Sequence, residues 1–215
     1  MKIHAIEYAR SNLPESMVLS GGDADQQLEI SFLLYVVETE SRKILIDAGC
    51  DSLPGFEMRS FISPAKALFD YGISPESITD VIITHAHHDH IDGLRHFPHS
   101  QIHIQANEYR NGLAYIPKNA ILSIFDEETV VAEKIFVERI GGHTAGSCIA
   151  KVQLGDTQYI FGGDECYLPI CLEKNIPTGA SHDSSASMSF IQRFSRPGYR
   201  VLLTHDTQIQ TGIIN

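Results

Sequence analysis

Residues 84–93, THAHHDHIDG, place four histidines and two aspartates in ten positions directly after an apolar run. The spacing H-x-H-x-D-H would arise by chance only roughly 0.002 times in a chain of this length and composition, so chance does not explain it. In an extended segment His85 and His87 project to the same side, where both imidazoles can bind one cation. Asp89 and His90 follow in a turn that redirects them. The stretch therefore indicates a strand that ends in a metal-binding loop.

If the loop takes part in binding two cations, its four donors leave both undercoordinated, so further metal-binding side chains are needed elsewhere in the chain. Three more donors each follow an apolar, strand-like run: His143 within residues 141–147 (GGHTAGS), Asp164 after residues 159–161, and His205 after residues 201–204. Strand ends hold site residues rigidly on a sheet. The predicted donors are His85, His87, Asp89, His90, His143, Asp164 and His205, which suit zinc best, with iron or manganese as alternatives. Structural or exposed positions are expected for the other histidines, namely His4, His88, His96, His99, His103 and His182.

The rest of the chain predicts a mixed α and β fold. Strands are expected at residues 2–8, 28–39, 43–46, 79–84, 101–104, 129–140, 148–154, 158–161 and 199–204, and helices at residues 65–71, 107–113 and 184–194. Residues 114–128 show no clear period and are expected to form a loop. Because few helices interrupt the strands, two sheets packed face to face with helices outside are favoured. No repeat or linker divides the chain, so residues 1–215 are expected to form one domain.

Composition and charge limit the partners. The 215 residues carry a formal net charge of −11, from 27 acidic and 16 basic side chains, with no dense Lys/Arg block. This balance is evidence against nucleic acid or an anionic membrane as the main partner. No stretch reaches the roughly 18 apolar residues of a membrane span, and the first residues lack a signal-peptide pattern. A cytoplasmic protein is therefore expected, and its four cysteines, which form no metal or disulfide pattern, are expected to be free thiols.

From about Phe32 to Asp206 the chain resembles the metallo-β-lactamase superfamily, through the motif at residues 84–90, the lone His143, Asp164 and His205. The resemblance implies a four-layered αββα sandwich of the α+β class. It also implies two metal sites, the first held by His85, His87 and His143 and the second by Asp89, His90 and His205, with Asp164 bridging them. Asp47, in the segment IDAG at residues 46–49, would support one of the ligands from behind.

The resemblance narrows the activity by exclusion. True β-lactamases usually have a cysteine in the second site, where this chain has His90 and the bridging Asp164. Flavodiiron oxygen reductases have a carboxylate at the position of His87. The sequence ends ten residues after His205, without the helical C-terminal domain of glyoxalase II relatives, and it lacks the basic surface of nuclease relatives. Hydrolysis of a small-molecule substrate is the activity that remains.

Tyr167 lies three residues beyond Asp164, a spacing similar to that in the N-acyl-homoserine lactonases. This similarity implies that Tyr167 faces the metals and donates a hydrogen bond to a lactone carbonyl. The alternative is that Tyr167 packs in the core. The sequence departs from the lactonases after His143, where it reads Thr-Ala-Gly-Ser instead of including a proline and a second histidine.

The predicted reaction is hydrolysis of an ester, lactone or thioester by a hydroxide bound to two divalent cations. Asp89 would carry a proton to the leaving oxygen. A phosphodiesterase of a small substrate, a mononuclear iron sulfur dioxygenase and a catalytically silent metal-binding protein are the alternatives. The loops at residues 11–27, 50–63, 114–128 and 168–183 are expected to shape the pocket, and a homodimer is compatible with the sequence.

Overall fold

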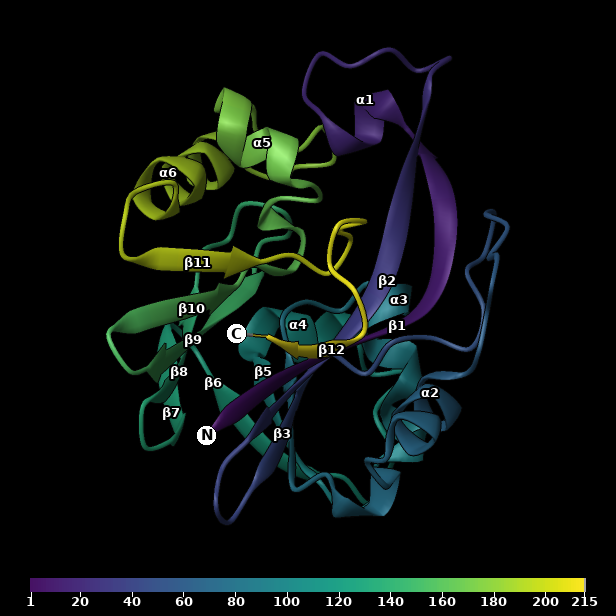
Figure 1. Cartoon of the computed structure of the whole chain (residues 1–215), viewed down its shortest axis with the longest axis vertical. Helices are drawn as coiled ribbons and strands as arrows, with labels where there is room; N and C mark the ends of the chain where they lie inside the picture. The colour runs from purple at the N-terminus through teal and green to yellow at the C-terminus, as the bar shows by residue number, and fades with distance from the viewer. Residues whose placement is uncertain (215) are drawn as a thin grey trace.

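Two β-sheets packed face to face form the centre of the molecule in the computed structural model, which describes residues 1–214 (Figure 1). The larger sheet contains, in spatial order, β12 (Gly212–Ile214), β1 (Lys2–Pro14), β2 (Gln27–Glu38), β3 (Lys43–Ile46), β4 (Asp80–Ile83), β5 (Gln101–Gln105) and β6 (Ile121–Phe125). The smaller sheet contains β11 (Tyr199–Leu202), β10 (Thr157–Phe161), β9 (Cys148–Leu154), β8 (Ile135–Arg139) and β7 (Glu128–Ala132).

The strand β2 shows how the apolar sequence builds the layers. Its alternate residues Leu33, Tyr35 and Val37 belong to the apolar cluster that joins the two sheets. The residues between them, such as Leu34 and Val36, belong to a second cluster that also includes helix side chains. Because β2 is covered on both faces, it is buried from Ile30 to Val37, and all of these residues except Ser31 are apolar.

Helices cover the outer faces of both sheets. The remaining elements are α1 (Glu15–Val18), α2 (Pro64–Tyr71), α3 (His88–Ile91), α4 (Ala106–Asn111), α5 (Pro169–Lys174) and α6 (Ser184–Phe194), with short 3₁₀ turns at η1 (Pro75–Ser77), η2 (Asp92–His96) and η3 (Gly163–Glu165). Figure 1 shows α5 and α6 beside the smaller sheet and α2, α3 and α4 beside the larger one. The predicted αββα sandwich is therefore confirmed. No helix within residues 1–214 is long and apolar enough to span a membrane.

The strand directions bring the predicted donors to one edge of the sandwich. β3, β4 and β5 are parallel neighbours in the larger sheet, so their carboxyl ends lie together. In the smaller sheet β10 is parallel to β11. β8 and β10 each pair antiparallel with β9, so β8 runs in the same direction as β10 and β11. Parallel strands end at the same edge, so the loops that follow β4, β8, β10 and β11 converge.

Several predictions about single elements are wrong. The loop expected at residues 11–27 contains the end of β1 and all of α1, and the loop expected at residues 168–183 contains α5. The strand expected at residues 129–140 is a hairpin of β7 and β8, with Lys134 at a positive φ of 66° in its turn. Apolar residues flank this turn on both sides, and its two residues, Glu133 and Lys134, are not the glycine or asparagine that usually marks such a conformation. The loop expected at residues 114–128 contains β6, an edge strand whose Ile121 and Ile124 are exposed. Its outward apolar residues hide the alternation that predicts a half-buried strand.

Truncating a side chain between the sheets should destabilise the whole fold. Leu33→Ala removes a 1% exposed side chain from the cluster that joins the sheets, so the free energy of unfolding should fall by about 2–5 kcal/mol. Urea denaturation followed by circular dichroism measures this change. Ile121→Ala is the matched control, because that side chain is 55% exposed, and it should cost under about 0.5 kcal/mol. Equal losses for the two variants would contradict this account of the core.

Candidate metal centre

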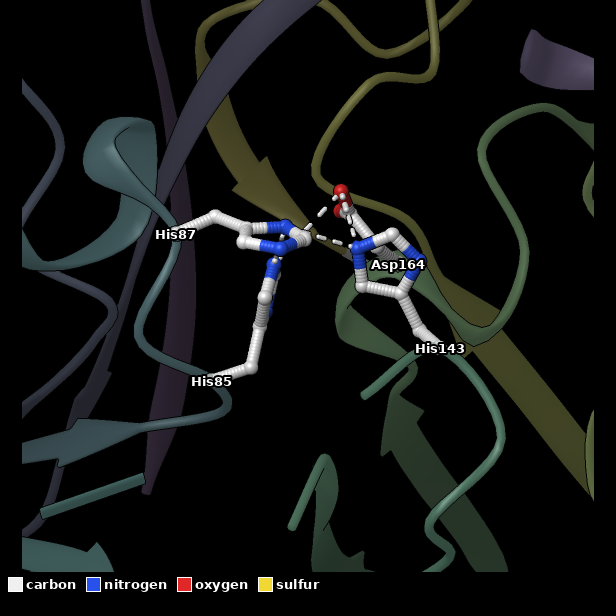
Figure 2. A group of neighbouring side chains, drawn as sticks. All are labelled: His85, His87, His143 and Asp164. Carbon is white, nitrogen blue, oxygen red and sulfur yellow. Dashed lines mark hydrogen bonds and ion pairs between the residues drawn. The ribbon is translucent and has the colours of Figure 1, made fainter. Parts of the chain in front are cut away.

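The structure brings all seven predicted donors together in two adjacent groups. One ligand atom from each of His85, His87, His143 and Asp164 lies within 4.8 Å of the others, and Figure 2 shows these side chains pointing toward one another. Asp89, His90 and His205 form the second group by the same measure. These residues come from both sheets, because His85 to His90 follow β4 whereas the other three follow β8, β10 and β11.

The first group is a triangle of imidazole nitrogens. His87 Nδ1 lies 3.0 Å from His85 Nε2 and 2.9 Å from His143 Nε2. The Oδ2 atom of Asp164 lies 3.8 Å from His85 Nε2 and 3.6 Å from His143 Nε2. Three nitrogens and one oxygen that face a common point are a typical donor set for a tetrahedral divalent cation.

Asp164 connects the first group to the second. Its other oxygen, Oδ1, lies 3.2 Å from His90 Nε2 and 3.3 Å from His205 Nε2. On the far side of these nitrogens, Asp89 Oδ2 lies 3.5 Å from His90 and 3.6 Å from His205. One carboxylate therefore presents one oxygen to each group, which is the arrangement required of a residue that bridges two cations.

Outer hydrogen bonds aim the imidazoles at the centre. His143 Nδ1 donates to the carbonyl of Ala180 at 2.6 Å, and His205 Nδ1 donates to the carbonyl of Ser31 at 2.8 Å. Since a carbonyl can only accept, each Nδ1 must carry a proton, and in the neutral ring this leaves a lone pair on Nε2. The tautomers of both histidines are thus fixed with their lone pairs toward the donor cluster.

Asp47 performs the supporting role that the resemblance implies for it. It has a positive φ of 58° directly after β3, and its Oδ2 atom accepts from His90 Nδ1 at 2.8 Å. Its two oxygens also accept from the backbone N–H of Thr84 at 2.8 Å and from the Thr84 hydroxyl at 2.9 Å. That hydroxyl lies 3.1 Å from His85 Nδ1, so it can accept the proton of that ring. Asp47 therefore orients one histidine of each group.

The unpaired atoms of the centre fit a divalent cation. His90 Nε2, His205 Nε2 and Asp164 Oδ1 are buried and have no hydrogen-bond partner within residues 1–214. When both rings are neutral, all three atoms present lone pairs to the same space. A buried polar atom without a partner costs about 1–3 kcal/mol, so the convergence of three is unfavourable unless a cation or protons lie among them.

Charge and burial act differently on the two groups. Burial lowers the pKa of His85, and it lowers the pKa of His143 to about 4, so both rings are neutral near pH 7 and can bind a metal. Burial also lowers the pKa of His90 and His205, but the facing carboxylates, Asp164 foremost, outweigh it and raise the pKa of both. The carboxylates therefore favour the protonated forms of His90 and His205 when no cation is bound.

Tyr167 lies against both groups. Its ring stacks on His205 with centroids 5.1 Å apart and an angle of 15° between the planes, and it meets His143 edge-on at 5.8 Å. Burial raises its pKa well above the usual value, and the charges of Asp164 and Asp89 add to this effect. The phenol is therefore a neutral hydrogen-bond donor in the wall of the site.

A cavity of about 280 Å³ opens onto the centre. Its walls include Leu13, Met17, Ile30, Phe32, Leu53, Pro54, Phe56, His87, His88, Asp89, His143, Asp164, Tyr167 and Ala180. Three of the four predicted loops contribute to this wall, whereas residues 114–128 do not. A larger hollow of about 470 Å³ lies beside Met1 and Arg42, but none of the seven donors lines it.

The other histidines largely follow their predicted roles. His4 lies 3.2 Å from Glu38, His96 lies 2.8 Å from Asp51 and His103 lies 2.9 Å from Asp80, all outside the donor cluster. His99 and His182 are exposed. His88 is the exception, because it lines the cavity while its Nδ1 atom lies 3.2 Å from the hydroxyl of Tyr115. The position of His88 within the histidine motif was the sequence feature that could have predicted its place in the cavity wall.

Comparison with known proteins identifies the family. The two-sheet fold with clustered histidine and aspartate donors is that of a metal-dependent hydrolase. The family model described as the metallo-beta-lactamase superfamily matches residues 33–205, so the chain belongs to this superfamily, as predicted. A 47-residue segment is 38% identical to metallo-beta-lactamase domain-containing protein 1 of Xenopus laevis and covers 22% of this chain and 20% of that protein.

Solved structures show the same fold at low sequence identity. An N-acyl homoserine lactone hydrolase with the product N-hexanoyl-L-homoserine at its catalytic metal centre has a TM-score of 0.81 and 21% identity, covering 96% of this chain and 94% of that one. A B. thuringiensis AiiA variant with N-decanoyl-L-homoserine at its active site gives 0.82 and 21%, with the same coverage. A probable metal-dependent hydrolase from Staphylococcus aureus gives 0.81 and 19%, covering 95% and 88%.

Removing the shared carboxylate should reduce metal uptake. Asp164→Ala deletes the carboxylate that presents one oxygen to each group, so the zinc content after incubation with zinc and desalting should fall from about two ions per chain to one or none. Mass spectrometry of the intact protein and elemental analysis measure this content. His96→Ala, which changes a histidine outside the cluster, should retain both ions. A zinc content unchanged by Asp164→Ala would refute the bridging role.

Metal binding should also release protons. Because the facing carboxylates raise the pKa of His90 and His205, the protonated forms of these rings are favoured when no cation is bound, and a cation has to displace protons from them. Calorimetric titration of the metal-free protein with zinc, in buffers of different ionisation enthalpy, should report a net release of protons. Fewer should be released at higher pH, where the rings are already neutral. A binding enthalpy that is the same in every buffer would contradict this expectation.

Proposed function

We propose that the chain is a two-metal hydrolase that cleaves a small molecule with an apolar acyl group, and that an N-acyl-homoserine lactone is the first substrate to test. The observation that carries the proposal is the position of Asp164 between two sets of imidazole nitrogens, next to an apolar cavity. Zinc is the favoured metal, because imidazole nitrogens predominate among the donors. A single domain over residues 1–215, a homodimer and a cytoplasmic location stay predictions.

The seven clustered donors would hold two divalent cations. Two such cations, when bound, lower the pKa of water toward neutrality and polarise a carbonyl group. The presence of the second group, with Asp89, His90 and His205, favours this function over a mononuclear iron dioxygenase, which needs only one site.

Asp89 is suited to move the proton. Its carboxylate lies at the edge of the second group and also lines the cavity, with a side chain that is 17% exposed. Hydrolysis forms a bond from a water oxygen to the acyl carbon and breaks the bond to the leaving oxygen. The proton that the water loses can pass through Asp89 to that leaving oxygen, so that no covalent enzyme intermediate is needed.

Tyr167 is suited to stabilise charge on the acyl oxygen. Its neutral phenol lies in the cavity wall against His143 and His205, near the expected position of the substrate carbonyl. A hydrogen bond that strengthens as the oxygen gains negative charge lowers the barrier instead of merely tightening binding.

The cavity wall favours an uncharged substrate with a hydrocarbon chain. Most of the wall away from the donors is apolar and comes from residues such as Leu13, Met17, Phe32, Leu53 and Phe56. No lysine or arginine is among the described residues that line it, whereas a phosphodiester would need a cationic partner. Similar solved structures with N-hexanoyl-L-homoserine or N-decanoyl-L-homoserine bound support this choice over the phosphodiesterase alternative.

A substrate panel tests the proposal. The zinc-loaded protein should hydrolyse N-hexanoyl-homoserine lactone with a higher kcat/KM than an acyl thioester or bis(p-nitrophenyl) phosphate. Tyr167→Phe should lower kcat on the lactone about 10-fold to 100-fold with zinc content unchanged, because only the hydroxyl is lost. Tyr159→Phe, at a buried tyrosine between the sheets, should leave kcat unaltered. Fastest turnover of the phosphodiester would overturn the substrate class, and an unaltered rate in Tyr167→Phe would remove that residue from the reaction.

A further inference from the structure

The loop that carries His143, residues 141–147, lies between two buried carboxylates that are not among the predicted donors. Glu108 belongs to α4 and is 1% exposed, and Glu165 belongs to η3 and is 0% exposed. Burying a carboxylate is unfavourable unless hydrogen bonds compensate, so each of them must have a full set of donors. The identity of these donors reveals what the two residues do.

Glu108 joins the two loops that supply the first group. Its Oε2 atom accepts from the backbone N–H of Ala86 at 2.8 Å, and Ala86 stands between His85 and His87. Its Oε1 atom accepts from the Thr144 hydroxyl at 2.7 Å and from the backbone N–H of Gly146 at 3.0 Å. The loop at residues 84–90 and the loop at residues 141–147 are therefore held together by hydrogen bonds to the two oxygens of one carboxylate.

Glu165 joins the same loop to the segment of the bridging aspartate, because it directly follows Asp164 in the chain. Its Oε1 atom accepts from the backbone N–H groups of Gly142 at 3.2 Å and His143 at 3.3 Å, and it also contacts the Ser147 hydroxyl. Its Oε2 atom accepts from the hydroxyl of Ser187 in α6 at 3.2 Å. The position of His143 relative to Asp164 thus depends on this side chain.

Two glycines of the loop are explained by these contacts. A Cβ atom added to Gly142 would lie 2.2 Å from Glu165 Oε2, and one added to Gly146 would lie 2.7 Å from Glu108 Oε1 and 2.3 Å from Gln105 Oε1. No real Cβ comes so close to another atom, so the backbone can approach each carboxylate only where a side chain is absent. The glycines flanking His143 are therefore matched to the two glutamates.

His87 has the greatest need of such support. The second ring nitrogens of His85, His90, His143 and His205 lie within hydrogen-bonding distance of Thr84, Asp47, Ala180 and Ser31 respectively. No residue within 1–214 makes a hydrogen bond to the Nε2 atom of His87, which is an exposed residue. Its ring is placed through the backbone, and the neighbouring N–H that fixes this backbone is bonded to Glu108.

We propose that Glu108 and Glu165 are positioning residues that set the distance from His143 to the other donors and thereby the metal affinity and coordination geometry of the centre. This inference rests on the proposed function in that it takes the clustered side chains as metal ligands. Neither glutamate has to contact the metal, because its oxygens are already occupied by donors from the loops.

The Glu→Gln variants isolate this role with almost no change of volume. A glutamine offers one NH₂ group and one oxygen, so at position 108 either Ala86 or Gly146 would face a donor instead of an acceptor. Asp80→Asn is the matched control. Asp80 is 2% exposed and accepts from Arg42, His103 and Thr79 at the first residue of β4, the opposite end of that strand from the donors.

The experiment measures zinc affinity by competition with a chelator and records the visible spectrum of the cobalt(II)-substituted protein, alongside the Tm of the metal-free form. Glu108→Gln and Glu165→Gln should each weaken zinc binding about 10-fold to 100-fold and shift the cobalt bands. Asp80→Asn should lower Tm without either effect. Thr144→Val and Ser187→Ala remove a single donor to each glutamate, so they serve if the glutamine variants do not fold, and they should weaken zinc binding several-fold.

The possible results separate the two proposals. If the glutamine variants lose Tm as Asp80→Asn does but keep the wild-type zinc affinity and cobalt spectrum, the glutamates are only structural and the inference is overturned. The same holds if the glutamine variants do not fold and Thr144→Val and Ser187→Ala bind zinc as the wild type does. If the wild-type protein itself binds no zinc or cobalt, the proposed function fails, and the positioning role fails with it.

Discussion

A buried carboxylate between two sets of imidazoles is the constraint on which the rest of this structure depends. Asp164 is 3% exposed, and its two oxygens face nitrogens of four different histidines. Such a charge is too costly to bury unless cations or protons neutralise it. The facing histidines His90 and His205 lower the pKa of Asp164 against the effect of burial. The surrounding elements keep these opposing charges at fixed distances.

The orientation of the imidazole rings is set by residues that lie outside the donor cluster. Asp47 and the carbonyls of Ser31 and Ala180 fix which nitrogen of each imidazole carries its proton. Ser31 lies on β2 and Asp47 directly follows β3, and both strands contribute side chains to the apolar layer between the sheets, so the ring orientations of His205 and His90 depend on that packing. Orientation from behind, added to a rigid sheet edge, is what allows several flexible side chains to meet at one point.

The donor set could be predicted from the sequence because each segment that carries donors follows a strand-like apolar run, and strand ends converge in a sheet fold. Two packed sheets could be predicted because few helices interrupt the strands, whereas the αββα layers were implied by the resemblance to the superfamily. Glu108 could not be predicted, because one glutamate in a short helix looks like surface charge until the loops that it joins are placed. The edge strand β6 and the turn at Lys134 were missed since their residues carry no local signal that separates them from loop or strand.

Because the donors come from both sheets, a bound cation would also affect the stability of the fold. His85, His87 and Asp89 extend from the larger sheet, whereas His143, Asp164 and His205 extend from the smaller one. An ion shared between them is a non-covalent staple across the sandwich, and any ligand that binds only the folded state raises the unfolding free energy by mass action. A bound cation should therefore make this protein more resistant to heat and proteolysis than its metal-free form.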